Sequence, residues 1–139
     1  MLFVPNIIWA KNKPEDYGTY SKDENRTLSL IERIGQVLVV CSLFFADNIS
    51  FTPWILMLVL AFIFMMLYEL YWIKYFRSPK TMKDMYSDFL GIPVAGATLP
   101  VLAFLFLGIY EMNPFLIFAV LVLAIGHIGI HLNYEKRVK

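Results

Sequence analysis

Apolar residues occur in four long blocks separated by short polar segments. A membrane-spanning helix needs about 20 mostly apolar residues to cross the roughly 30 Å hydrocarbon layer. Three blocks reach that length, namely residues 54–76, 85–110 and 115–134. The first block has a shorter uncharged run, residues 34–46, so a full span must extend back towards residue 22. The pattern therefore predicts an all-α fold, a polytopic transmembrane bundle of four helices.

Residues typical of helix starts precede these blocks. A capping side chain followed by proline marks the first turn of a helix. Such pairs occur at Thr52-Pro53, Ser78-Pro79 and Asn113-Pro114. Ser21 with Glu24, and Thr81 with Asp84, have the spacing of a capping box. We expect helices over residues 22–46, 53–76, 81–110 and 114–134, which form one transmembrane domain (residues 22–139) after an N-terminal segment (residues 1–21).

The third helix is expected to be kinked. Pro93 and Pro100 each remove a main-chain hydrogen bond, and their separation of seven residues puts them on nearly the same face. Ser87, Gly91 and Ala95 form a stripe of small residues that allows a neighbouring backbone to come close.

The basic residues predict the orientation of the bundle. All 12 Lys and Arg lie before or at the start of the first helix, between the second and third helices, or after the fourth. The other two connections, residues 47–52 and 111–113, contain none. Because positive charges are retained in the cytoplasm, both termini are expected on the cytoplasmic side of a cell membrane.

The composition supports this class of protein. Hydrophobic residues make up 59% of the 139 residues and charged residues 17%, against about 45–50% and 25% in soluble domains. These values exclude a disordered chain and an ordinary water-soluble enzyme. The net charge of +1 gives no reason to expect a nucleic-acid partner, and the single Cys41 excludes an intrachain disulfide.

The N-terminus does not resemble a cleaved signal peptide, because it lacks a basic start and a small-residue cleavage site. The apolar stretch over residues 2–9 is too short to span a membrane. We interpret residues 1–21 as a cytoplasmic or interfacial segment anchored by Trp9. The alternative is that this stretch ends a longer upstream helix.

Ionisable residues inside the predicted spans are the strongest pointers to function, because they are expensive to place in a membrane. They lie at a similar depth in all four helices, in the half of the bundle nearer the cytoplasm. His127 and His131 share one helical face, and so do Glu32 and Gln36. We therefore expect a polar pocket lined by Glu32, Gln36, Glu69, Asp88, His127 and His131.

Three kinds of chemistry are compatible with these residues. His127 and His131, four residues apart, could bind a divalent metal ion with Glu69 or Asp88 as a third ligand. Glu69 and His127 could instead exchange protons. In the third interpretation the histidines only form hydrogen bonds that hold helices together. The sequence has no phosphate-binding loop, dinucleotide fingerprint or nucleophile elbow.

Four stretches together resemble a group of small, uncharacterised multi-pass bacterial membrane proteins. These are Pro5-Asn6-Ile7-Ile8-Trp9, Glu32-Arg33-Ile34-Gly35-Gln36-Val37, Gly91-Ile92-Pro93-Val94-Ala95-Gly96-Ala97 and Gly126-His127-Ile128-Gly129-Ile130-His131. The resemblance implies a bacterial cytoplasmic membrane and no particular activity. The small size is also similar to that of integral-membrane methyltransferases, but their Arg-His-Pro motif and paired C-terminal glutamates are absent.

The leading hypothesis is that the protein binds or transports a small solute or ion, with Glu69 and His127 as the central pair. A second hypothesis is a membrane-embedded enzyme that acts on a lipid-soluble substrate with a His/Glu site, with or without a metal ion. A third is a structural or regulatory membrane subunit. The sequence assigns no catalytic residue, and a homo-oligomer in the lipid bilayer is expected because four helices seldom enclose a complete pathway.

Overall fold

A computed structural model describes residues 3–22, 24–44 and 55–139 of the chain. Every regular element in these ranges is a helix: α1 (Phe3–Lys11), α2 (Tyr17–Ser21), α3 (Arg26–Phe44), α4 (Ile55–Phe76), α5 (Met82–Met85), α6 (Ala95–Tyr110) and α7 (Pro114–Val138). Three of them, α3, α4 and α7, are long and apolar enough to cross a membrane, and α6 is a shorter apolar helix. The described part of the chain is therefore all-helical, and three of its helices have the length and hydropathy of membrane-embedded helices.

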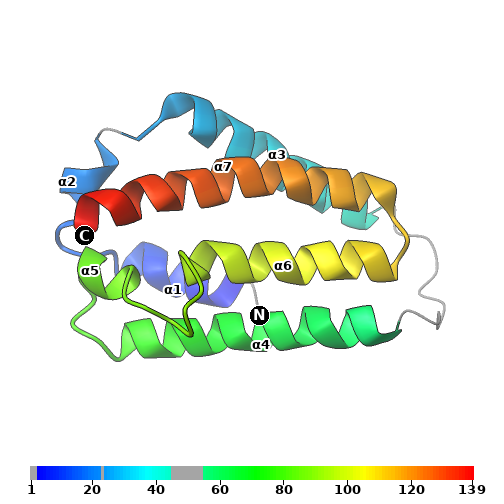
Figure 1. Ribbon diagram of the computed structural model, residues 1–139. Coiled ribbons are helices and arrows are strands. Elements are labelled where there is room, and N and C mark those ends of the chain that lie inside the picture. The colour runs from blue at the N-terminus through cyan, green and yellow to red at the C-terminus, as the bar shows by residue number, and fades with distance from the viewer. Residues whose placement is uncertain (1–2, 23, 45–54) are drawn as a thin grey trace.

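The four longer helices form a row in which each contacts its neighbour. α7 packs against both α3 and α6, and α6 also packs against α4, whereas α3 and α4 lie at opposite ends of the row. In Figure 1 the C-terminus, α2 and α5 lie at one end of these helices and the α6–α7 turn lies at the other. α1 runs beside the half of the bundle that carries the C-terminus, where the Asn6 side-chain oxygen accepts a hydrogen bond from Tyr68 at 3.3 Å.

The outward faces of these helices carry large apolar side chains. Phe44 on α3 is 83% exposed, Phe62 on α4 is 59% exposed and Phe118 on α7 is 62% exposed. Exposed apolar area on this scale is unfavourable in water by about 25 cal/mol per Å². A lipid environment removes that cost, which agrees with the hydropathy of α3, α4 and α7.

The start of α3 differs from the sequence expectation. Ser21 is the last residue of α2, and the Asn25 side-chain oxygen instead accepts hydrogen bonds from the main-chain nitrogens of Thr27 and Leu28 at 3.0 and 3.3 Å. Asn25 therefore supplies the cap for which Ser21 was predicted, because an asparagine directly before the first turn can reach those donors. The expected start at Thr52-Pro53 lies outside the described residues.

The segment expected as one helix over residues 81–110 is divided into α5 and α6. The capping box of Thr81 and Asp84 is confirmed, but it starts only the four-residue α5. Leu90, Gly91 and Val94 have positive φ values of 56°, 69° and 42°, which an α-helix does not accommodate. Residues 86–94 therefore form an irregular connection, and α6 begins at Ala95 and continues through Pro100.

The turn between α6 and α7 has a complete set of main-chain caps. Asn113 accepts a hydrogen bond from the Leu116 nitrogen at 3.0 Å, which confirms the predicted start of α7. Met112 and Asn113 donate main-chain hydrogen bonds to the Ile109 and Gly108 carbonyls, the Schellman pattern of a helix C-terminus. Met112 takes the left-handed position, at φ 51°, that glycine usually occupies in this motif.

We expect Met112→Gly to raise the free energy of unfolding by about 0.5–1 kcal/mol, because glycine adopts the left-handed conformation without the Cβ penalty. Met112 is 69% exposed, so little packing is lost. The measurement is reversible unfolding in mixed detergent micelles. Met112→Ala is the matched control, since it shortens the side chain but keeps the Cβ. An equal gain in Met112→Ala would show that backbone conformation is not the cause.

Candidate functional site

The site is built on an unusually close contact between α3 and α7. Glycines allow the two backbones to approach. A Cβ on Gly126 would lie 2.3 Å from the Glu32 main-chain nitrogen, and a Cβ on Gly35 would lie 2.5 Å from the Leu123 Cα. Gly129 faces the Leu28 side chain in the same interface. Small residues at such positions are the usual means by which membrane helices come into direct contact.

This contact places a carboxylate beside a histidine. The Glu32 Oε1 lies 2.6 Å from the His127 Nδ1, and it also accepts a hydrogen bond from the Gln36 amide at 3.2 Å. The side chains of His127 and Glu32 are only 23% and 20% exposed. A carboxylate this close stabilises a histidine whose Nδ1 carries the proton. The pair therefore joins α3 to α7 through one hydrogen bond between a carboxylate and an imidazole ring.

His131 extends the polar cluster towards the end of the bundle that carries the C-terminus. Its ring centroid lies 4.7 Å from that of His127, and its Nδ1 lies 2.8 Å from the Tyr86 hydroxyl. Tyr86 belongs to the irregular connection between α5 and α6. Burial raises the pKa of Tyr86 well above its usual value, so the hydroxyl stays protonated and available for hydrogen bonding.

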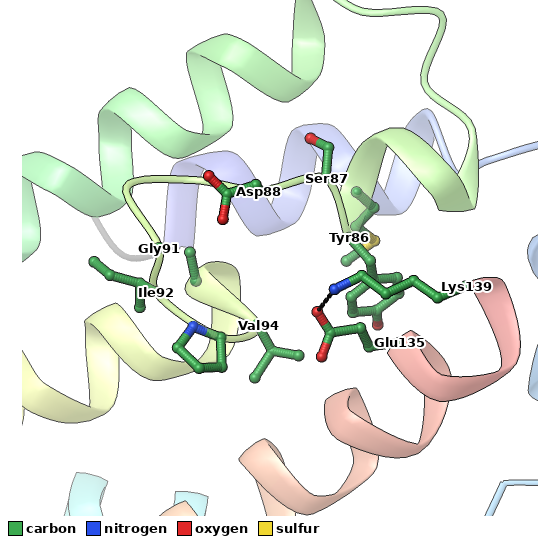
Figure 2. A pocket seen from close by; sticks show the side chains of 11 residues that line it. Tyr86, Ser87, Asp88, Gly91, Ile92, Val94, Glu135 and Lys139 are labelled. Atoms are coloured by element: carbon green, nitrogen blue, oxygen red, sulfur yellow. Dashed lines mark hydrogen bonds and ion pairs between the residues drawn. The ribbon is translucent and has the colours of Figure 1, made fainter.

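Tyr86 also forms part of the wall of a cleft of about 290 Å³. Figure 2 shows the cleft between the connection before α6 and the C-terminal turns of α7. Its lining is mixed: apolar side chains, two carboxylates and one lysine. The lining residues are Met85, Tyr86, Ser87, Asp88, Gly91, Ile92, Pro93, Val94, Ala95, Glu135 and Lys139. The volume is at the lower end of the range for small-molecule sites.

The structure divides the six predicted pocket residues into three groups. Glu32, Gln36, His127 and His131 form the polar cluster described above. Asp88 lines the cleft instead. Glu69 is on α4, at the far end of the row, and within the described residues it has no hydrogen bond to His127; its Oε1 is buried without a partner.

These positions bear on the predicted metal site of His127, His131 and Glu69. In residues 3–22, 24–44 and 55–139, no three His, Cys, Asp or Glu side chains lie together in a way that could hold a metal ion. The Nδ1 atoms of the two histidines instead contact Glu32 and Tyr86. The metal hypothesis therefore has no third ligand within the described residues.

Sequence reasoning missed Tyr86 and the pairing of Glu24 with Tyr134. The Tyr134 hydroxyl donates to the Glu24 Oε2 at 2.5 Å, which ties the start of α3 to the last turns of α7. The two partners are 110 residues apart in the chain, so no local pattern predicts the pair. Tyr86 has no local pattern that marks it, and only the break before α6 brings it to His131.

We expect Gly126→Ala to lower the free energy of unfolding by about 1–3 kcal/mol, because the added methyl group forces α3 and α7 apart. The same separation should break the Glu32–His127 hydrogen bond. Unfolding in mixed micelles measures the first effect, and the ¹⁵N chemical shifts of the His127 ring measure the second. Gly18→Ala is the control, since nothing lies within 4 Å of a Cβ there. Equal stability of Gly126→Ala and the wild type would contradict this close contact.

Comparison with other proteins supplies no function for this arrangement. No protein-family model, curated protein or solved structure matches the chain. The site itself consists of a carboxylate–histidine pair between two helices and a second histidine that connects the pair to the cleft through Tyr86.

Proposed function

We propose that α3, α4, α6 and α7 are four membrane spans and that both termini face the cytoplasm. In support, the basic residues next to α2, α5 and the C-terminus gather at one end of the bundle (Figure 1). The described residues of the α6–α7 turn contain no lysine or arginine. The third span is interrupted before α6, so Pro93 lies in the connection at the proposed cytoplasmic end, whereas Pro100 lies inside α6.

We further propose that the protein binds a small solute or ion at this end, as the binding step of a transport cycle. The observation that carries the proposal is the contact of Tyr86 with His131. It joins the cleft to the polar cluster of Glu32 and His127, so that a solute in the cleft would lie at one end of a connected set of polar side chains.

The cost of the polar cluster supports a functional role. Ionisable side chains inside a membrane are unfavourable by several kcal/mol and persist where they pair with one another or line a cavity. The Glu32–His127 pair meets the first condition, and the hydrogen bond of His131 to Tyr86 connects it to the cleft. In this proposal Glu32 replaces Glu69 as the partner of His127.

Four helices in one row seldom enclose a complete transport pathway. α3 and α4 lie at opposite ends of the row, so each leaves a flank on which a second copy of the chain can pack. We propose a homo-oligomer for this reason; two-fold dimers are the commonest assembly of this kind.

A structural subunit is the second candidate function, and the glycine contacts favour it. Gly35, Gly126 and Gly129 would bring α3 and α7 together even in a protein that binds nothing. In that case the Glu32–His127 hydrogen bond serves only to join helices, a contribution of about 0.6–2 kcal/mol to stability in membranes.

Solute binding separates these functions. We expect the wild-type protein in lipid nanodiscs to bind at least one probe from a panel of ethanolamine, glycine, acetate, ethylene glycol and potassium chloride. Tyr86→Phe should weaken that binding about 2–10-fold, because it removes one hydrogen bond at the wall of the cleft. Isothermal titration calorimetry measures the affinity.

Glu69→Gln is the matched control for this experiment, since Glu69 lies outside the polar cluster and its replacement has nearly the same shape. It should keep the wild-type affinity. The solute-binding proposal fails if no probe binds the wild-type protein, and the role given to Tyr86 fails if Tyr86→Phe binds as well as the wild type. Loss of stability in Glu32→Gln without any solute binding would favour the structural subunit.

A further inference from the structure

The charged side chains that line the cleft determine which class of ligand it can bind. Three charged side chains line it: Asp88, Glu135 and Lys139. Lys139 donates to the Glu135 Oε1 at 2.7 Å, so these two neutralise each other. In Figure 2 this pair lies across the cleft from the Asp88 side chain. One carboxylate therefore remains to be balanced.

Asp88 has no side-chain partner among the described residues. Lys74 donates to the Asp88 main-chain carbonyl, and its ammonium group lies 5.8 Å from the centre of the Phe89 ring. Lys74 does not line the cleft. The Asp88 carboxylate is directed into the cleft in Figure 2, where it is open to a ligand.

The rest of the lining limits the shape of that ligand. Ile92, Pro93 and Val94 give one side of the cleft an apolar surface. A cleft of about 290 Å³ has room for a small molecule only. A ligand that matches this lining has a cationic group with several hydrogen-bond donors for the carboxylate. It also has a short, weakly polar body for the apolar side of the cleft. A primary ammonium group has three donors and pairs well with a carboxylate.

We propose that the cleft binds a small ligand with a primary ammonium group, held by Asp88. This inference rests on the proposed function, because it names the class of solute that the site takes. The ammonium group can belong to a free solute or to an aminophospholipid headgroup, since the cleft lies at the end of the bundle assigned to the cytoplasmic membrane surface. The two sources share the same contacts in the cleft.

The test measures ethanolamine binding by isothermal titration calorimetry to the full chain in phosphatidylcholine nanodiscs, whose lipids lack a primary ammonium group. Asp88→Asn should weaken ethanolamine binding at least about tenfold, because it removes the charge-assisted hydrogen bond. Lys139→Met should strengthen the binding, because it leaves Glu135 unpaired and makes the cleft more negative. Both side chains are on the surface, so neither change should affect folding.

Asp84→Asn is the control for Asp88→Asn. Asp84 lies four residues away, caps α5 and does not line the cleft, so its replacement should leave ethanolamine affinity unchanged. Equal affinity of Asp88→Asn and the wild type would overturn the proposal. Tighter binding of acetate than of ethanolamine, weakened by Lys139→Met, would also overturn it, because the cleft would then be an anion site.

A second arm identifies the source of the ammonium group. In nanodiscs that contain phosphatidylethanolamine, a headgroup ligand would weaken ethanolamine binding by competition, and this effect should disappear in Asp88→Asn. A free solute would bind equally in both lipids, and either result supports the ammonium assignment. Failure of ethanolamine in both lipids, with Tyr86-dependent binding of glycol or acetate, rejects the ligand class and leaves the proposed function standing. Failure of every probe rejects both.

Discussion

The polar cluster of this structure depends on the contact between α3 and α7 at Gly126. Polar side chains inside a membrane must find partners within the protein, because lipid offers none. Gly126 provides the space for the Glu32 backbone, and that approach brings the Glu32 carboxylate to 2.6 Å from the His127 ring. Without it, Glu32 and His127 would lose each other as partners.

The irregular connection before α6 is the second feature that forms the site. A continuous helix over residues 81–110 would carry Tyr86 and Asp88 along its own axis. The left-handed residues Leu90, Gly91 and Val94 instead fold the connection back over the start of α6. The same break puts Tyr86 against His131 and opens the cleft beside Asp88. Interrupted helices with irregular backbone at a binding site are a recurring feature of membrane transporters.

Local patterns predicted the parts of this protein that depend on neighbouring residues. Adjacent positions predicted the helical class and the long apolar helices that became α3, α4 and α7, and the structure confirms them. They also predicted the caps at Thr81 and Asn113, which are confirmed. Ser21 was the wrong cap for α3, because Asn25, four residues further on, has an equivalent side chain at the position where the helix starts. The common face of His127 and His131 also followed from their spacing.

The sequence by itself thus determined the class of the protein, its membrane-embedded helices and the set of polar residues from which a site can be built, because hydropathy and capping act over short distances along the chain. Only the tertiary structure decided which of those residues meet. It paired His127 with Glu32, 95 residues away, rather than with Glu69, and it added Tyr86 to the cluster. The reason is physical: partner choice depends on which helix faces come together, and the glycines of α3 and α7 and the break before α6 set those faces through contacts between distant segments.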